Sequence, residues 1–156
     1  MLDIQTLSIA VATVSVVAGV MYYSFQLRNQ SKTRQTDLLV RLYSVTNGKD
    51  WLEAWEKVID REVMDHSDYK KKYGFVEFNE VYSFFLLLGV LLRRRLVDID
   101  LVHDIFQGQI KVLWEKVKPI IEGGRKRFND PSLGKGFEYL YDEMKKREQR
   151  LQQIQQ

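Results

Sequence analysis

The sequence contains no cysteine, only two prolines, and almost no excess of either charge. Without cysteine, disulfides, thiolate metal sites and cysteine nucleophiles are excluded. Lys and Arg number 24 against 21 Asp and Glu, a net charge of +3 that is far from the balance of a dedicated nucleic-acid binder. Few prolines leave room for long helices, and 12% aromatic residues supply a core. With no repeat and no strand pattern, we expect an all-α fold.

One long segment lacks charge altogether, from Ile4 to Leu27. As a helix it would span roughly 36 Å, enough to cross a hydrocarbon layer about 30 Å thick with some tilt. A cleaved signal peptide fits less well, because Asp3 precedes the run and no Lys or Arg does. A buried soluble helix rarely lacks a charged face over such a length, and an interfacial helix needs one. The sequence therefore predicts a transmembrane anchor over residues 1–27 and a cytoplasmic helical domain over 28–156.

The flanking cations and the small residues of this run indicate its orientation and its contacts. All of the cations follow the run: Arg28, Lys32, Arg34 and Arg41. Basic residues stay on the cytoplasmic side, so we expect a single-pass protein of the plasma membrane with its amino terminus outside. Small residues share one helix face: Ser8, Ala12, Ser15 and Gly19. Such a face lets a second helix approach in lipid, which favours self-association or a protein partner; the alternative is that small residues are simply common there.

Helical periodicity continues after the run. Leu38, Leu39, Leu42 and Val45 form an apolar stripe that extends the first helix. Asn47-Gly48 predicts a turn, and Asp50 with Glu53 resembles a capping box for the next helix.

The remaining segments predict a connection, a central helix and two further helices. "HSDYKKKYG" (66–74) is expected to be a polar connection. The uncharged stretch 81–92 is too short to span a membrane and predicts a buried central helix. Asp98 or Asp100 is a candidate cap for the next helix, and Pro119 with Gly123-Gly124 predicts a kink or an end there. The last helix is expected to begin near Phe137.

Two groups of residues are candidates for contacts with other molecules. Trp51 and Trp55 share a helix face that is either core or a groove for a partner. Basic triplets recur along the chain and include Lys70, Lys71, Lys72, Arg93, Arg94, Arg95, Arg125, Lys126 and Arg127. Beneath a bilayer they are candidate contacts for anionic lipid or another anion. The alternatives are nucleic-acid phosphates, for which no motif is present, and solvated helix ends.

No catalytic constellation is evident. His66 and His103 are the only histidines, and each is expected at a surface or a helix end. Asp100 and His103 share a helix face but supply at most half of a zinc site. The stretch 129–136 lacks the first glycine and the Ser/Thr of a phosphate loop. We therefore expect no enzyme, no metal, no cofactor and no small-molecule substrate.

Three segments carry a resemblance to a known family: "FNEVYSFFLLLGVLLRRRLVDIDLVHDIF", "LWEKVKPII" and "FNDPSLGKGFEYLYDEM". Together they resemble a family of small prokaryotic helical proteins, many with one N-terminal span, that is known only as a domain of unknown function. The likeness covers about residues 28–146. It implies an all-helical fold at the membrane and assigns no catalytic residue.

These observations lead to three hypotheses of function. The first is a membrane-anchored scaffold, adaptor or accessory subunit of a larger membrane complex, with the lipid bilayer and another protein as partners. The second is a membrane-tethered sensor or defence effector that binds nucleotide or nucleic acid through the basic clusters. The third is an enzyme assembled from scattered Asp, His and Arg side chains.

Overall fold

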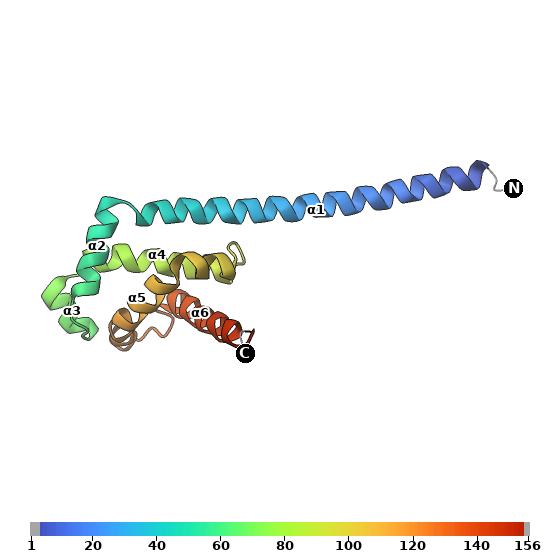
Figure 1. Cartoon of the computed structure of the whole chain (residues 1–156). Coiled ribbons are helices and arrows are strands. Elements are labelled where there is room, and N and C mark those ends of the chain that lie inside the picture. Colours follow the sequence, from blue (N-terminus) through green and yellow to red (C-terminus); the bar gives the residue numbers. More distant parts are fainter. Residues whose placement is uncertain (1–3, 155–156) are drawn as a thin grey trace. The chain divides into compact units, whose positions relative to one another are not determined.

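All of the regular secondary structure in the described residues is α-helical, as the sequence predicts. The computed structural model describes residues 4–154, with side chains described from Ser15 to Gln153 (Figure 1). The helices are α1 (Ile4–Thr46), α2 (Lys49–Asp60), α3 (His66–Tyr73), α4 (Val76–Arg93), α5 (Ile99–Phe128) and α6 (Lys135–Ile154). The chain divides into two compact units between Asp37 and Leu38, and we call residues 38–156 the helical unit. In the part of the chain that is described, no helix has an apolar stretch long enough to cross a membrane.

The last turns of α1, from Leu38 to Thr46, belong to the helical unit. Leu39 is only 1% exposed, and Leu38 and Leu42 pack beside it against the core. The expected stripe is wrong at Val45, whose side chain is 53% exposed, while Thr46 is buried in its place. A helix advances about 100° per residue, so a neighbouring position takes the inward direction at the last turn.

Two helix starts differ from their predictions. Gly48 caps α2 without any side-chain hydrogen bond, so the capping box at Asp50 is wrong; Asp50 lies within the first turn, where the helix dipole favours a carboxylate. The expected polar connection 66–74 is also wrong, because it contains α3. The Asp65 carboxylate caps this helix by accepting hydrogen bonds from the amides of Ser67 and Asp68 at 2.8 and 2.9 Å.

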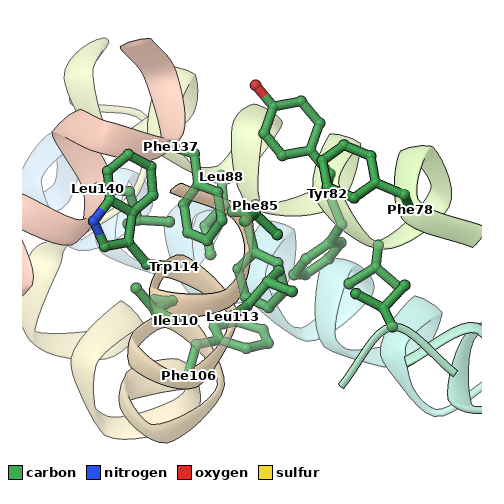
Figure 2. Close-up of a cluster of buried hydrophobic side chains, with 14 of the residues drawn as sticks. Phe78, Tyr82, Phe85, Leu88, Phe106, Ile110, Leu113, Trp114, Phe137 and Leu140 are labelled. Carbon is green, nitrogen blue, oxygen red and sulfur yellow. The ribbon is translucent and has the colours of Figure 1, made fainter. Parts of the chain in front are cut away.

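α4 is the centre of the helical unit, as its apolar sequence predicts. It contacts both α6 and α2, while α5 contacts α6 and α3. The Phe85 ring stacks on Phe137 of α6 at 5.4 Å and meets Phe106 of α5 edge-on at 6.4 Å. Figure 2 shows these rings interleaved between the three helices, with Leu88, Ile110 and Leu113 filling the space between them.

Two glycines set how closely α4 and α6 approach. A Cβ on Gly89 would lie 2.6 Å from the carbonyl carbon of Gly136 and closer still to its oxygen. A Cβ on Gly136 would in turn meet the Leu86 carbonyl oxygen at 3.0 Å. Both obstacles are backbone atoms, so the two helices touch main chain to main chain at this crossing.

α5 continues through every residue expected to interrupt it. Pro119 lies inside the helix, which ends only at Phe128. The predicted end is therefore wrong: proline removes one backbone donor, and burial of Val117, Ile120 and Ile121 on both sides of it keeps the segment helical. Asp98 caps the start of α5 by accepting from the Asp100 amide at 2.8 Å, as one of the two predicted alternatives has it.

α6 begins at Lys135, two residues before the expected start. Phe137, Leu140 and Met144 are buried along its inner face. Arg147 follows on the same stripe, and its Nε lies 2.5 Å from an Asp100 carboxylate oxygen of α5. After the buried apolar side chains, this face of α6 therefore continues with an ion pair between two helices.

Candidate functional site

A pocket of about 280 Å³ opens between α3, α4 and α5. Aromatic and aliphatic side chains make up most of its wall, which includes Phe75, Phe78, Ile120, Ile121, Phe128 and Leu133. Four polar side chains also line it, from His66, Lys70, Asn79 and Tyr82. Small-molecule sites are typically apolar concavities with a few convergent polar groups, and this pocket has that composition.

His66 is the first residue of α3 and is held between aromatic rings. Its imidazole lies 4.9 Å from the Phe75 ring and 5.4 Å, edge-on, from the Phe128 ring. The side chain is 9% exposed, and of the two expected positions, a surface or a helix end, the structure confirms the helix end. Its Nδ1 is buried and has no hydrogen-bond partner.

The glycine pair of α5 brings His66 to this position. A Cβ on Gly123 would meet the His66 backbone nitrogen and Cβ at 3.0 Å, and a Cβ on Gly124 would meet His66 Cδ2 at 3.2 Å. The doublet therefore does not end α5. Because these two residues have no side chains, the start of α3 packs directly against the backbone of α5.

Tyr82 forms the opposite polar group, on α4. Its ring stacks on Phe78 at 5.2 Å, and its phenol oxygen points away from the rings of the core (Figure 2). The side chain is 9% exposed, and its hydroxyl has no hydrogen-bond partner. Gly134 closes over this hydroxyl with a φ of +75°, and a Cβ there would lie 3.0 Å from it.

The pKa values of the two unpaired groups, the His66 imidazole and the Tyr82 hydroxyl, are shifted in opposite directions, mainly by burial in both cases. Burial, together with the charges of Arg127 and Lys70, lowers the pKa of His66, and Asp65 opposes this only in part. Burial raises the pKa of Tyr82, against the charge of Arg125. Both groups are therefore neutral near pH 7, and both residues line the pocket.

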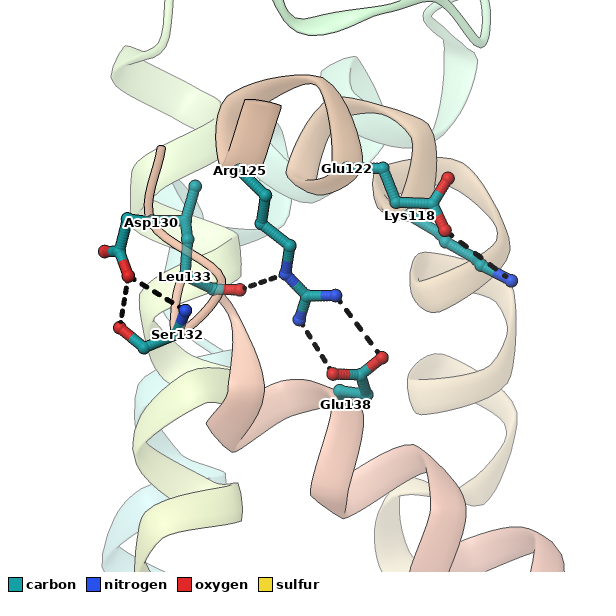
Figure 3. A network of polar contacts seen from close by, with 7 residues as sticks. All are labelled: Lys118, Glu122, Arg125, Asp130, Ser132, Leu133 and Glu138. Atoms are coloured by element: carbon teal, nitrogen blue, oxygen red, sulfur yellow. Dashed lines mark hydrogen bonds and ion pairs between the residues drawn. The ribbon is translucent and has the colours of Figure 1, made fainter. Parts of the chain in front are cut away.

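An ion-pair network holds the loop beside the pocket. Arg125 donates from Nε to the Leu133 carbonyl at 2.8 Å and from Nη2 to Glu138 at 2.7 Å (Figure 3). The Glu138 hydrogen bond raises the pKa of Arg125, and the Arg125 hydrogen bond lowers the pKa of Glu138. In the loop itself, the Asp130 carboxylate accepts from the Ser132 amide and hydroxyl at 2.8 and 2.6 Å.

The predicted basic contacts are placed in different surroundings. Lys70 lines the pocket, whereas Lys71 lies 4.0 Å from Asp68 and Lys72 lies 2.6 Å from Glu62. Arg93, Arg94 and Arg95 are exposed at the end of α4. Lys126 is exposed on α5, Arg127 donates to the Ser67 hydroxyl at 3.4 Å, and Arg125 holds α5 to α6 instead of facing solvent.

The other predicted residues lie away from the pocket. Trp51 is in the core at 3% exposure and stacks on the half-buried Trp55 at 5.4 Å. Ser15 and Gly19 are exposed on α1, while the side chains of Ser8 and Ala12 lie outside the described residues.

His103 is also buried, at 7% exposure, so its expected surface position is wrong. Its Nδ1 lies 3.5 Å from Asp104. Among the described side chains, no three His, Asp or Glu gather as a metal site would require.

Sequence reasoning missed His66 and Tyr82 because both were assigned to other roles. Asp65 followed three positions later by Asp68 could have indicated a capped helix. On such a helix His66, Tyr69 and Tyr73 share a face at spacings of three and four.

The fold and the pocket define an all-α protein in which a long first helix leads into a small helical unit with an apolar, aromatic-lined site. The chain belongs to the family described as Domain of unknown function (DUF4760), whose model matches residues 8–144. This confirms the expected membership in a family known only as a domain of unknown function. No curated protein and no solved structure matches the chain.

Proposed function

We propose that this chain is a single-pass membrane protein whose helical unit acts on the cytoplasmic side as a scaffold, adaptor or accessory subunit of a larger membrane complex. The observation that carries the proposal is the uncharged run from Ile4 to Leu27, with cations on its carboxyl side only. The positive-inside rule then gives the orientation.

A further observation supports the anchor. The family model starts at residue 8 and so takes in most of the run, which makes the segment part of the family pattern and not an addition to this chain. Ser15 and Gly19, on the small-residue face, are candidate contacts for a second helix in lipid.

Insertion is tested by placing charge in the middle of the run. Each Arg at the centre of a span opposes insertion by about 2.5–3.5 kcal/mol, so the double variant Val16→Arg, Val17→Arg is expected to leave the membrane fraction on alkaline carbonate extraction. The matched control is Val76→Arg, at a side chain that is 79% exposed in the helical unit. Release of the unaltered chain by carbonate would refute the anchor.

Orientation is tested with single cysteines, which the native chain lacks. In intact cells a membrane-impermeant maleimide is expected to label Leu2→Cys and to leave Gln152→Cys unlabelled until the cells are opened. The reverse pattern would refute the orientation.

The partner is sought by photo-crosslinking from within the run. A photoreactive residue at Gly19 lies on the small-residue face, and one at Val17 lies on the opposite face, because two helical steps turn about 200°. We expect a discrete crosslinked product, either a dimer or a second protein, from position 19 and much less from position 17. A monomer alone at both positions would count against a packing role for this face.

A further inference from the structure

Three consecutive arginines at the end of α4, Arg93 to Arg95, form a positive patch that we call the arginine patch. All three are exposed, and among the described side chains none of them makes an ion pair or a side-chain hydrogen bond. The nearest carboxylates along the chain are already engaged, because Asp98 caps α5 and Asp100 pairs with a side chain of α6. The patch therefore presents its charge to molecules outside the helical unit.

Two other basic triplets are partly neutralised within the chain. In 70–72, two of the lysines lie 4.0 and 2.6 Å from carboxylates. In 125–127, Arg125 pairs with Glu138 and Arg127 donates to a serine hydroxyl. Of these three triplets, the arginine patch is thus the one whose charge the fold does not use.

The backbone of the patch adopts a conformation that arginine disfavours. Arg95 has a φ of +57°, in the left-handed region. The amides of Arg95 and Leu96 donate to carbonyl oxygens of the last turn of α4 at 2.9 and 3.0 Å, the two bonds of a helix end that usually has glycine at this position. Where α3 and α5 end with a positive φ, the residue is Gly74 or Asn129. A long cation in such a position indicates a function for its side chain, because strained residues cluster at functional sites.

The residue after the patch indicates a lipid surface. Leu96 is 52% exposed, whereas Val97 beside it is 3% exposed and fixes the turn to the core. At a membrane interface an apolar side chain enters the acyl boundary while cations meet the anionic head groups. A nucleic-acid backbone would engage the cations but offers no apolar layer for the leucine.

We propose that the arginine patch and Leu96 dock the helical unit on an anionic membrane surface, with the guanidinium groups on lipid phosphates and the leucine in the interface. The inference rests on the proposed function, because the anchor is what keeps this unit beside a bilayer. Docking makes the unit responsive to the anionic lipid content of the membrane.

The test uses the full chain in lipid nanodiscs, with an environment-sensitive fluorophore on Leu96→Cys, since the native chain has no cysteine. The emission is expected to shift to the blue when about one third of the phosphatidylcholine is replaced by phosphatidylglycerol, and added salt should reverse the shift. The control is the same fluorophore on Val76→Cys, at the other end of α4 and 79% exposed. Equal shifts at the two positions, or none at position 96, would overturn the proposal.

Two triple variants of the labelled chain locate the docking. The first replaces the patch: Arg93→Gln, Arg94→Gln and Arg95→Gln. The second removes the same charge elsewhere: Lys70→Gln, Lys71→Gln and Lys72→Gln. The first is expected to abolish the shift, because each well-placed cation changes the ratio of docked to undocked chain about fivefold, and the second to leave it in place. Equal losses would overturn the assignment to the patch.

Arg95→Gly separates docking from stability. Glycine adopts a positive φ without the steric penalty, so Tm is expected to rise by about 1–4 °C while the ratio of docked to undocked chain falls about fivefold. A lower Tm would show that Arg95 is kept for the fold and would overturn its role in docking.

Failure of the docking and failure of the anchor give different results. A chain that enters neutral and anionic nanodiscs equally but shows no shift refutes the docking alone. A chain that stays out of both refutes the anchor, and the docking is then measured with the same fluorophore on titration with anionic vesicles, where no shift overturns it. An equal shift with soluble heparin in place of lipid would overturn the assignment to a membrane.

Discussion

Adding one methyl group at Gly89 is expected to separate the two helices at the centre of the helical unit. The new Cβ would lie 2.6 Å from the Gly136 carbonyl carbon, and no side-chain rotation can relieve a contact with backbone. Overpacking of this kind typically destabilises by about 1–3 kcal/mol and occasionally by more. Replacing glycine by alanine inside a helix returns up to about 1 kcal/mol. Because the obstacle is backbone and lies inside the distance that real Cβ atoms keep, we place the cost at or above about 3 kcal/mol, and we expect Gly89→Ala to lower the free energy of unfolding by about 2 kcal/mol or more.

Two other glycines provide a graded comparison. A Cβ on Gly108 of α5 would meet nothing within 4 Å, so Gly108→Ala should raise stability by about 0.5–1 kcal/mol through helix propensity alone. A Cβ on Gly136 would meet a movable Leu86 methyl at 2.9 Å and the Leu86 carbonyl oxygen at 3.0 Å. The effect of Gly136→Ala on the free energy of unfolding should therefore lie between those of Gly89→Ala and Gly108→Ala.

The assay is thermal unfolding followed by near-ultraviolet circular dichroism, which reports mainly the packed aromatic rings of the helical unit. For a chain of this size 1 kcal/mol corresponds to about 2–4 °C in Tm. Gly89→Ala is expected to lower Tm by about 4–8 °C and Gly108→Ala to raise it by about 1–4 °C. If both substitutions shifted Tm in the same direction by the same amount, the close main-chain contact between α4 and α6 would be refuted.

Three further outcomes follow from the pocket and its surroundings. Tyr82→Phe removes an unpaired buried hydroxyl, so denaturant unfolding should show unchanged stability or a gain of up to about 1 kcal/mol. The control is Tyr69→Phe, which removes a hydroxyl that accepts a hydrogen bond from a guanidinium at 3.1 Å. That variant should lose about 1 kcal/mol of stability. The pKa of His66 is lowered in the folded state, so the unfolded chain binds more protons and the free energy of unfolding should fall as pH drops from about 7 to 5. His66→Gln should flatten that pH dependence. An unchanged slope in the variant would refute the assignment of this dependence to His66. Arg125→Ala removes the ion pair with Glu138 and the hydrogen bond to the Leu133 carbonyl, so it should destabilise the fold by about 1–3 kcal/mol. Lys126→Ala changes an exposed side chain and should cost less than about 0.5 kcal/mol. Similar losses for the two variants would contradict a stabilising role of the Arg125 contacts.

Features that depend on local pattern could be predicted from the sequence. The apolar stretch of α4 is buried against several neighbours, and its composition alone predicts that. The cap at Asp98 follows from a short polar side chain placed just before an apolar run. The all-α class follows from helical spacing over most of the chain.

Features that depend on a distant neighbour could not be predicted. Pro119 and the glycines of α5 are interruptions in any local analysis, and only the buried side chains around them show why the helix persists. Gly89 and Gly136 lie far apart in the sequence, so their contact is invisible before the helices are packed. The pocket was missed for the same reason, since it needs His66, Tyr82 and Lys70 from two helices brought together.

The strip of bare backbone at Gly123 and Gly124 has a consequence for how this family can vary. A side chain at Gly123 would press on the backbone of His66, whereas one at Gly124 would press on the side chains of Leu133 and His66. Members of the family that exchange Gly123 should therefore also remodel residues 65–75, which form one wall of the pocket. Correlated substitution between these two short stretches, about fifty positions apart, is what this contact should produce in an alignment.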